Sequence, residues 1–155
     1  RVMSAAFTRV ALNRTGNTPI SKKQVSVTAS RHVRVSGSRR TDRTSTIRLQ
    51  VRTNRTGLML KNQTVNIRFF TKPVGARGRI VPRMARSGSI RLPELTSDGV
   101  YIDCAGVTTS RTSSYGTDFY GIVVSVYNSE GALTYQGMSA AGLRDQASAA
   151  KTTAP

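Results

Sequence analysis

Residues 49–70 read LQVRTNRTGLMLKNQTVNIRFF and contain the clearest structural pattern in the chain. Leu49 and Val51 alternate with polar neighbours, and Val65 and Ile67 do the same after a polar stretch that contains one glycine. A period of two gives a β-strand one face toward a core and one toward solvent. The stretch therefore predicts two half-buried strands joined by a bend.

The same alternation continues on both sides of this stretch. We expect strands at 24–35, 44–52, 64–72, 80–84, 89–92, 100–107, 119–127 and 132–136, separated by turn signals such as Ser87-Gly88 and Asn128-Ser129-Glu130-Gly131. The strands do not alternate with helical segments, which argues against a βαβ fold. The expected fold is all-β: an antiparallel immunoglobulin-like β-sandwich with an extended N-terminal arm and at most one short C-terminal helix.

We predict three segments within the 155 residues. Residues 1–23 form an extended N-terminal arm and loop, residues 24–138 form the sandwich domain, and residues 139–155 form a short helix and tail. The arm carries apolar side chains on both sides of its alternation, which is typical of a strand covered on two faces. Gly16 and Pro19 interrupt the chain after it, so the arm could reach a neighbouring copy. The expected anchors of the arm are Val2, Phe7, Val10 and Leu12.

The charge is strongly positive and unevenly distributed. Lys and Arg number 24 against seven acids, for a formal net charge of +17. Residues 1–91 hold 21 basic side chains and one acid, a net +20, whereas residues 92–155 hold three basic side chains and six acids, a net −3. Such a protein attracts nucleic acid, acidic polysaccharide or anionic lipid. The candidate polyanion-binding residues are Arg39, Arg40, Arg43, Arg77, Arg79, Arg83, Arg86 and Arg91. Arg48, Arg52 and Arg68 are expected on outward, solvent-facing positions of the central strands.

The aromatic content argues against nucleic acid as the main ligand. The chain has five Tyr, four Phe and no Trp, and most of them fall in the apolar pattern. Binding of single strands needs exposed rings on which bases stack. Only Phe70 and Tyr115 are expected to be exposed.

No combination of residues predicts an enzyme, and we expect no cofactor. His32 is the only histidine, has no acid near it in sequence and is expected at the surface. No nucleophile elbow or phosphate-binding loop is present. Asp98, Asp103 and Asp118 could meet at one end of the sandwich and bind calcium, but their spacing matches no calcium loop, so loop solvation and capping are favoured.

Cysteine and asparagine give weaker indications. Cys104 is the only cysteine, so no intrachain disulfide can form; a buried thiol is expected, with an intermolecular disulfide as the alternative. Asn13, Asn54 and Asn62 each begin an N-x-S/T sequon and are possible glycosylation sites of a secreted protein. No apolar run reaches the length of a membrane span.

Residues 49–70 resemble the central hairpin of bacterial secreted immunoglobulin-like surface and adhesion domains. The positions that carry this resemblance are Val51, Asn54, Gly57, Val65, Ile67 and Phe69. The segment FYGIVVSVYNSEGALTYQG, with Gly121 and Gly131, resembles the final hairpin of such domains. The resemblance spans residues 24–138 and implies a binding or structural role without catalytic residues. The chain departs from the family in its arm and in its high arginine content.

We therefore expect a non-enzymatic structural subunit of an extracellular or cell-surface assembly, filament-like, that self-associates when its arm adds a strand to a neighbouring copy. Its main partner would be itself, with acidic polysaccharide or nucleic acid as further partners. One alternative is a nucleic-acid-binding coat or packaging protein that uses its arginine-rich surface. A second alternative is a surface module that binds acidic glycans.

Overall fold

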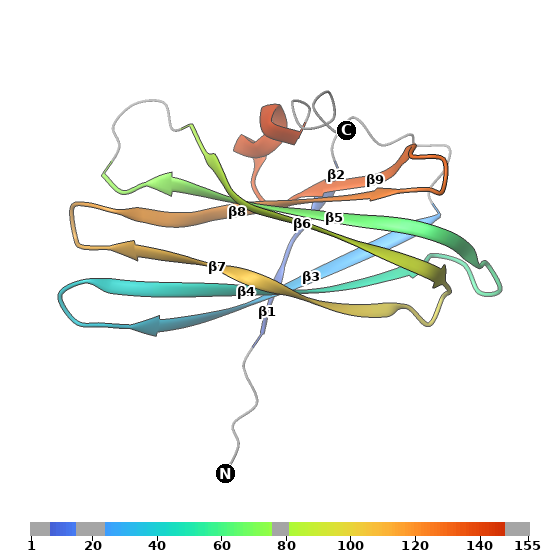
Figure 1. Ribbon diagram of the computed structural model, residues 1–155, viewed down its shortest axis with the longest axis horizontal. Coiled ribbons are helices and arrows are strands. Elements are labelled where there is room, and N and C mark those ends of the chain that lie inside the picture. The colour runs from blue at the N-terminus through green and yellow to red at the C-terminus, as the bar shows by residue number, and fades with distance from the viewer. Residues whose placement is uncertain (1–6, 15–23, 76–80, 148–155) are drawn as a thin grey trace, which may run out of the picture.

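The structure is a computed structural model that describes residues 7–14, 24–75 and 81–147 (Figure 1). Two antiparallel sheets stack face to face. Sheet A has the order β1-β3-β4-β7, and its strands are β1 (Thr8–Val10), β3 (Val25–Ser36), β4 (Thr41–Thr53) and β7 (Val100–Arg111). Sheet B has the order β2-β9-β8-β5-β6, and its strands are β2 (Asn13–Arg14), β9 (Leu133–Met138), β8 (Thr117–Tyr127), β5 (Leu60–Pro73) and β6 (Arg83–Leu95). The predicted all-β antiparallel sandwich is confirmed.

The core lies between the two sheets and follows the predicted alternation. Leu49 and Val51 of β4 and Val65 and Ile67 of β5 are all buried in it. However, β4 belongs to sheet A and β5 to sheet B, so the expectation of a hairpin within residues 49–70 is wrong. Both strands bury one face in the same core, and they therefore face each other across the sandwich instead of sharing hydrogen bonds.

Two predicted strand boundaries differ from the structure. Ser87-Gly88 is not a turn, because β6 is one strand in which Gly88 lies opposite Ile67 of β5. Residues 108–111, which lie beyond the expected strand 100–107, are strand as well, since β7 runs to Arg111 and pairs with the far end of β4. In both places, pairing with a long neighbouring strand outweighs the local turn composition.

The turn between β8 and β9 lies where the sequence predicted it. Gly131 there has φ +82°, a conformation that favours glycine. The side chain of Asn128 accepts hydrogen bonds from the backbone N–H groups of Glu130 and Ala132. This Asn and Gly together determine the turn.

A short C-terminal helical segment covers the outer face of sheet B. It begins with a 3₁₀ turn, η2 (Ala141–Leu143), and continues as helix to residue 147. Leu143 packs there against Phe70, and Arg68 Nη1 donates a hydrogen bond to the carbonyl oxygen of Gln146 at 3.2 Å. Phe70 and Arg68 are consequently buried, and the prediction that they face solvent is wrong. Alternation identifies the outer face of a strand but not whether another element covers it.

No helix in the described part of the chain has the length and hydrophobicity that a membrane span requires.

Candidate functional site

The N-terminal segment closes one lateral side of the sandwich. Val10 of β1 lies opposite Ala29 of β3 in sheet A, and Asn13 of β2 lies opposite Met138 of β9 in sheet B. The side chains of Val10 and of Leu12, which lies between the two strands, pack against the core. Residues 7–14 therefore cross from one sheet to the other and fill the gap between their edges.

The predicted arm anchors thus have different positions. Phe7 lies on the outer face of sheet A, with its ring centroid 5.6 Å from that of His32. Val10 and Leu12 contact the chain's own core. Val2 lies outside the described residues. Within residues 7–14, the arm is thus part of the chain's own sandwich.

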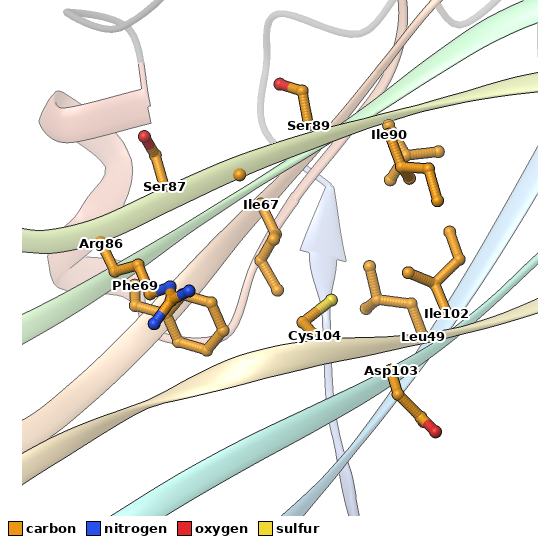
Figure 2. A pocket seen from close by; sticks show the side chains of 12 residues that line it. Leu49, Ile67, Phe69, Arg86, Ser87, Ser89, Ile90, Ile102, Asp103 and Cys104 are labelled. Carbon is orange, nitrogen blue, oxygen red and sulfur yellow. The ribbon is translucent and has the colours of Figure 1, made fainter.

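The opposite lateral side is open (Figure 2). Here β6 ends sheet B and β7 ends sheet A, and within the described residues the one pairing on either outer edge is an isolated bridge between Arg111, at the end of β7, and Gly116. A cavity of about 210 Å³ lies between them. We call this opening the lateral mouth. Its lining includes Leu49, Phe69, Gly88, Ile90, Ile102 and Cys104.

A glycine keeps the lateral mouth open. Gly88 lies opposite Ile67, so a side chain at this position would point toward the core face. A Cβ atom added to Gly88 would contact no atom within 4 Å. Ile90, the next inner-face residue of β6, is 44% exposed although its side chain points between the sheets. The edge of sheet B therefore lacks the side chains that would complete the core.

Cys104 and two charged groups line the lateral mouth. The Cys104 thiol is partly buried, and this burial, with a further contribution from the charge of Asp103, raises its pKa to about 11. It is therefore an un-ionised, weakly nucleophilic group near neutral pH. Arg86 reaches from β6 toward β7, where its Nη1 donates to the carbonyl oxygen of Gly106 at 3.4 Å. The lateral mouth is thus apolar inside with a cation at its rim.

The predicted polyanion-binding arginines do not form one surface. Arg39 and Arg40 are exposed at the β3–β4 turn, where Arg40 Nε donates to Ser110 Oγ at 2.7 Å. Arg43 lies on the inner face of sheet A. Along β6, Arg86 points inward, Arg91 lies opposite the outer-face residue Thr64, and Arg83 lies opposite Thr71, beyond an irregularity in the β5–β6 register. Arg77 and Arg79 lie outside the described residues. Arginines on an edge strand also prevent uncontrolled edge pairing, which accounts for several of these positions.

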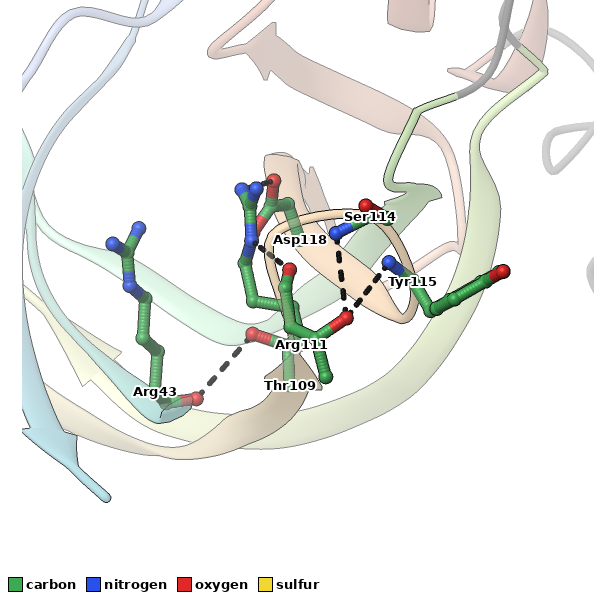
Figure 3. Close-up of polar contacts among 7 residues, drawn as sticks. Arg43, Thr109, Arg111, Ser114, Tyr115 and Asp118 are labelled. Atoms are coloured by element: carbon green, nitrogen blue, oxygen red, sulfur yellow. Dashed lines mark hydrogen bonds and ion pairs between the residues drawn. The ribbon is translucent and has the colours of Figure 1, made fainter. Parts of the chain in front are cut away.

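One ion pair and one turn organise the β7–β8 end of the sandwich (Figure 3). Arg111 Nη1 lies 2.7 Å from Asp118 Oδ2. Thr112 Oγ1 accepts hydrogen bonds from the backbone N–H groups of Ser114 and Tyr115, and the Tyr115 side chain is 77% exposed as expected. Tyr101 on β7, 68% exposed, is a further exposed ring that the sequence pattern did not reveal.

The remaining predicted positions are dispersed. Asp103 pairs with Arg48 at 2.7 Å, Asp118 pairs with Arg111, and Asp98 lies in the β6–β7 turn, so the structure does not bring the three aspartates together. The described residues contain no group of three potential metal ligands. His32 lies on the outer face of sheet A, and the sequon residues Asn13, Asn54 and Asn62 are all exposed.

Sequence reasoning missed the lateral mouth because it assigned Gly88 to a turn. The available signal was that Gly88, Ile90 and Leu92 belong to one continuous two-residue period once β6 is a single strand. Comparison with known proteins adds no family: no protein-family model matches the chain, and no curated protein sequence matches it significantly.

Proposed function

We propose that this protein is a non-enzymatic structural subunit of an extracellular or cell-surface assembly, and that copies associate by strand addition at the lateral mouth. The contrast between the two sides of the sandwich carries the proposal. On one side, an extended apolar segment, residues 7–14, fills the gap between the sheets. On the other side, the equivalent gap is an apolar cavity between two free edges.

The occupant that the proposal assigns to the lateral mouth is residues 1–6 of a second copy, RVMSAA. This segment continues the two-sided apolar character of the arm, with Val2 and Met3 on opposite sides of its alternation. Six extended residues span roughly 20 Å, and the five residues of β6 that line the lateral mouth span roughly 16 Å. A donor strand would gain hydrogen bonds from the free edge and side-chain contacts in the cavity together.

The positions of donor and acceptor favour an open chain of subunits. Residues 1–6 lead directly into β1, at one end of sheet A, whereas β7 is at the other end of that sheet. Each copy would therefore donate on one side and accept on the other. Such heterologous contacts propagate into a filament unless the rotation between copies closes a ring.

The net charge gives the proposal a distinctive salt dependence. Every copy carries a formal charge of +17, so copies repel one another at low ionic strength. Salt should consequently strengthen self-association, whereas it weakens binding to nucleic acid steeply. The exposed sequon residues are compatible with the extracellular location that the proposal includes.

The test uses two variants that each remove one half of the contact. Deletion of residues 1–6 removes the donor and leaves residues 7–14 in place. Gly88→Leu fills the acceptor, and Ser87→Leu is its matched control, because the Ser87 side chain points away from the lateral mouth (Figure 2). Size-exclusion chromatography with light scattering, at several salt concentrations, measures assembly. The ratio of absorbance at 260 and 280 nm reports bound nucleic acid, because the chain has no Trp.

We expect the native chain and Ser87→Leu to form large assemblies and the other two variants to be monomers. A mixture of the deletion variant and Gly88→Leu should form a dimer and stop there, since only one acceptor and one donor remain. Assembly of the deletion variant to the native size would refute the proposal. Native assemblies that contain nucleic acid and dissociate as salt is raised would instead support the coat-protein alternative.

A further inference from the structure

Two arginines converge on the inner face of sheet A, beside the β3–β4 turn. Arg31 and Val33 continue the inner-face alternation of β3, and Arg43 and Ser45 that of β4. The register puts Ser45 opposite Val33 and Arg43 opposite Val35. Directly opposite residues share a face of the sheet, so one cross-strand pair separates Arg31 from Arg43.

The Arg31 side chain is held in place and directed toward Arg43. Its Nε and Nη2 donate hydrogen bonds to Ser45 Oγ at 3.2 and 2.9 Å, and its Cζ lies 4.1 Å from the centroid of the Phe119 ring in sheet B. Burial, and in second place the positive charge of Arg43, lower the pKa of Arg31. The register thus places two positive charges on one face of the sheet, separated by a single cross-strand pair.

No described carboxylate neutralises these two cations. Asp118 is paired with Arg111, and Asp42 lies on the outer face of the sheet, where its Oδ1 accepts a hydrogen bond from Ser110. Within residues 7–14, 24–75 and 81–147, the guanidinium of Arg43 has neither an ion-pair nor a hydrogen-bond partner. Figure 3 shows that the guanidinium groups of Arg43 and Arg111 extend to the same side of the sheet. Arg31 is partly buried, and burial of a cation without a counter-charge lowers the stability of the fold. An anion bound between Arg31 and Arg43 would offset this loss of stability.

We infer that Arg31 and Arg43 form a binding site for an oxyanion: a sulfate, phosphate or carboxylate group. Guanidinium groups bind such anions through paired, charge-assisted hydrogen bonds. Val33 and Val35, on the same face, are 37% and 56% exposed, so solvent and ligand reach the site. Arg31 is already oriented by Ser45 and Phe119, which limits the entropy lost on binding. The site is separate from the lateral mouth and does not depend on self-association.

The test compares two single-charge variants on one strand. Arg43→Gln removes an exposed guanidinium of the site, and Arg52→Gln removes an exposed guanidinium on the outer face of the same strand. Calorimetric titration with inorganic sulfate, at an ionic strength held constant with chloride, measures affinity. The NMR signal of the Arg31 Nε–Hε group reports where sulfate binds. We expect the native protein and Arg52→Gln to bind sulfate, with a shift of that signal. Arg43→Gln should bind about tenfold or more weakly.

Equal sulfate affinity of the native protein and Arg43→Gln would overturn the site, as would absence of sulfate binding by the native protein. Two polymers, a sulfated polysaccharide and single-stranded DNA, then identify the source of the oxyanion under the same conditions. Polysaccharide binding that weakens in Arg43→Gln but not in Arg52→Gln assigns the group to an acidic glycan. The same result with DNA assigns it to nucleic acid. If neither polymer depends on Arg43 while sulfate does, the ligand is a small free oxyanion.

Discussion

The guanidinium carbon of Arg48 lies 4.4 Å from the centroid of the Phe7 ring. Phe7 directly precedes β1, and Arg48 is in β4, so this cation–π contact joins the N-terminal segment to the outer face of its own sheet. The same guanidinium is held from the other side by Asp103, whose Oδ1 lies 2.7 Å from Arg48 Nε. Phe7, one of the predicted anchors of the arm, thus contacts the outer face of its own sheet.

Replacement of Phe7 by Ala should loosen the N-terminal edge without unfolding the sandwich. The ring contacts Arg48 and His32, and β1 is only three residues long and pairs with β3 on one edge, so the ring contacts are a substantial part of what holds β1 in place. We expect the backbone N–H of Val10 to exchange with solvent faster, while core amides such as that of Leu49 keep their protection. Tyr115→Ala, at an exposed ring, is the control. Unchanged protection at Val10 would contradict this role of Phe7.

Asp103 should make stability sensitive to acid. The hydrogen bond from Arg48 lowers the pKa of Asp103 below its ordinary value. A carboxyl group whose pKa is lower in the folded state stabilises the fold at neutral pH, and this contribution disappears as the pH falls through the folded-state pKa. Asp103→Asn should therefore be slightly less stable near neutral pH and should lose less stability on acidification. Urea unfolding from about pH 7 to about pH 2 measures both effects. If the unfolding free energies of the native protein and Asp103→Asn change with pH in parallel, the Arg48–Asp103 pair contributes nothing to stability.

Leu143→Ala should destabilise the protein through the outer face of sheet B. Leu143 is fully buried there against Phe70 and Val123. Truncation of a buried Leu typically costs about 2–5 kcal/mol. The midpoint of urea unfolding should fall accordingly, and an exposed neighbour, Arg144→Ala, should change the unfolding free energy by less than about 0.5 kcal/mol. Equal stability of the two variants would mean that the helical segment is not docked on the sheet.

Two glycines in edge strands should respond oppositely to the same methyl group. A Cβ at Gly106 would overlap the carbonyl oxygen of Ser45, next to an irregularity in the β4–β7 register. Gly106→Ala should therefore cost about 1–3 kcal/mol, as overpacking usually does. A Cβ at Gly88 meets nothing within 4 Å, so Gly88→Ala should be neutral or stabilising. Urea unfolding measures the stability of both variants, and Gly88→Ala should be the more stable one. A lower stability of Gly88→Ala than of Gly106→Ala would contradict the open edge beside Gly88.

Cys104 should act as a chemical reporter of the lateral mouth. Burial raises the pKa of its thiol to about 11, with Asp103 as the smaller cause. Alkylation by iodoacetamide near neutral pH should be slow in the folded protein compared with the denatured chain, and should accelerate as the pH approaches that value. Gly88→Leu should slow the reaction further, because its side chain fills the opening. Equally fast alkylation of the folded and denatured protein would show that the thiol is not enclosed.

The sequence predicted those features that depend on one strand and its two faces. Alternation around Leu49 and Ile67 correctly identified the core-facing residues, because a period of two describes the strand wherever the strand is placed. The Asn128–Gly131 turn was equally local, since its backbone conformation requires particular residue types. The absence of helical periodicity before residue 139 was sufficient for the all-β class.

The tertiary structure alone decided which faces are covered and which edges are free. Phe70 occupies an outer position that alternation assigned to solvent, and it is buried because a segment far along the chain packs on it. Gly88 has the composition of a turn, yet pairing with β5 makes it the open inner position of an edge strand. Arg31 and Arg43 share a face only because of the β3–β4 register. By itself, the sequence determined the sandwich, its inner faces and its positive charge. The lateral mouth and the arginine pair depend on contacts between distant segments, which local patterns do not encode.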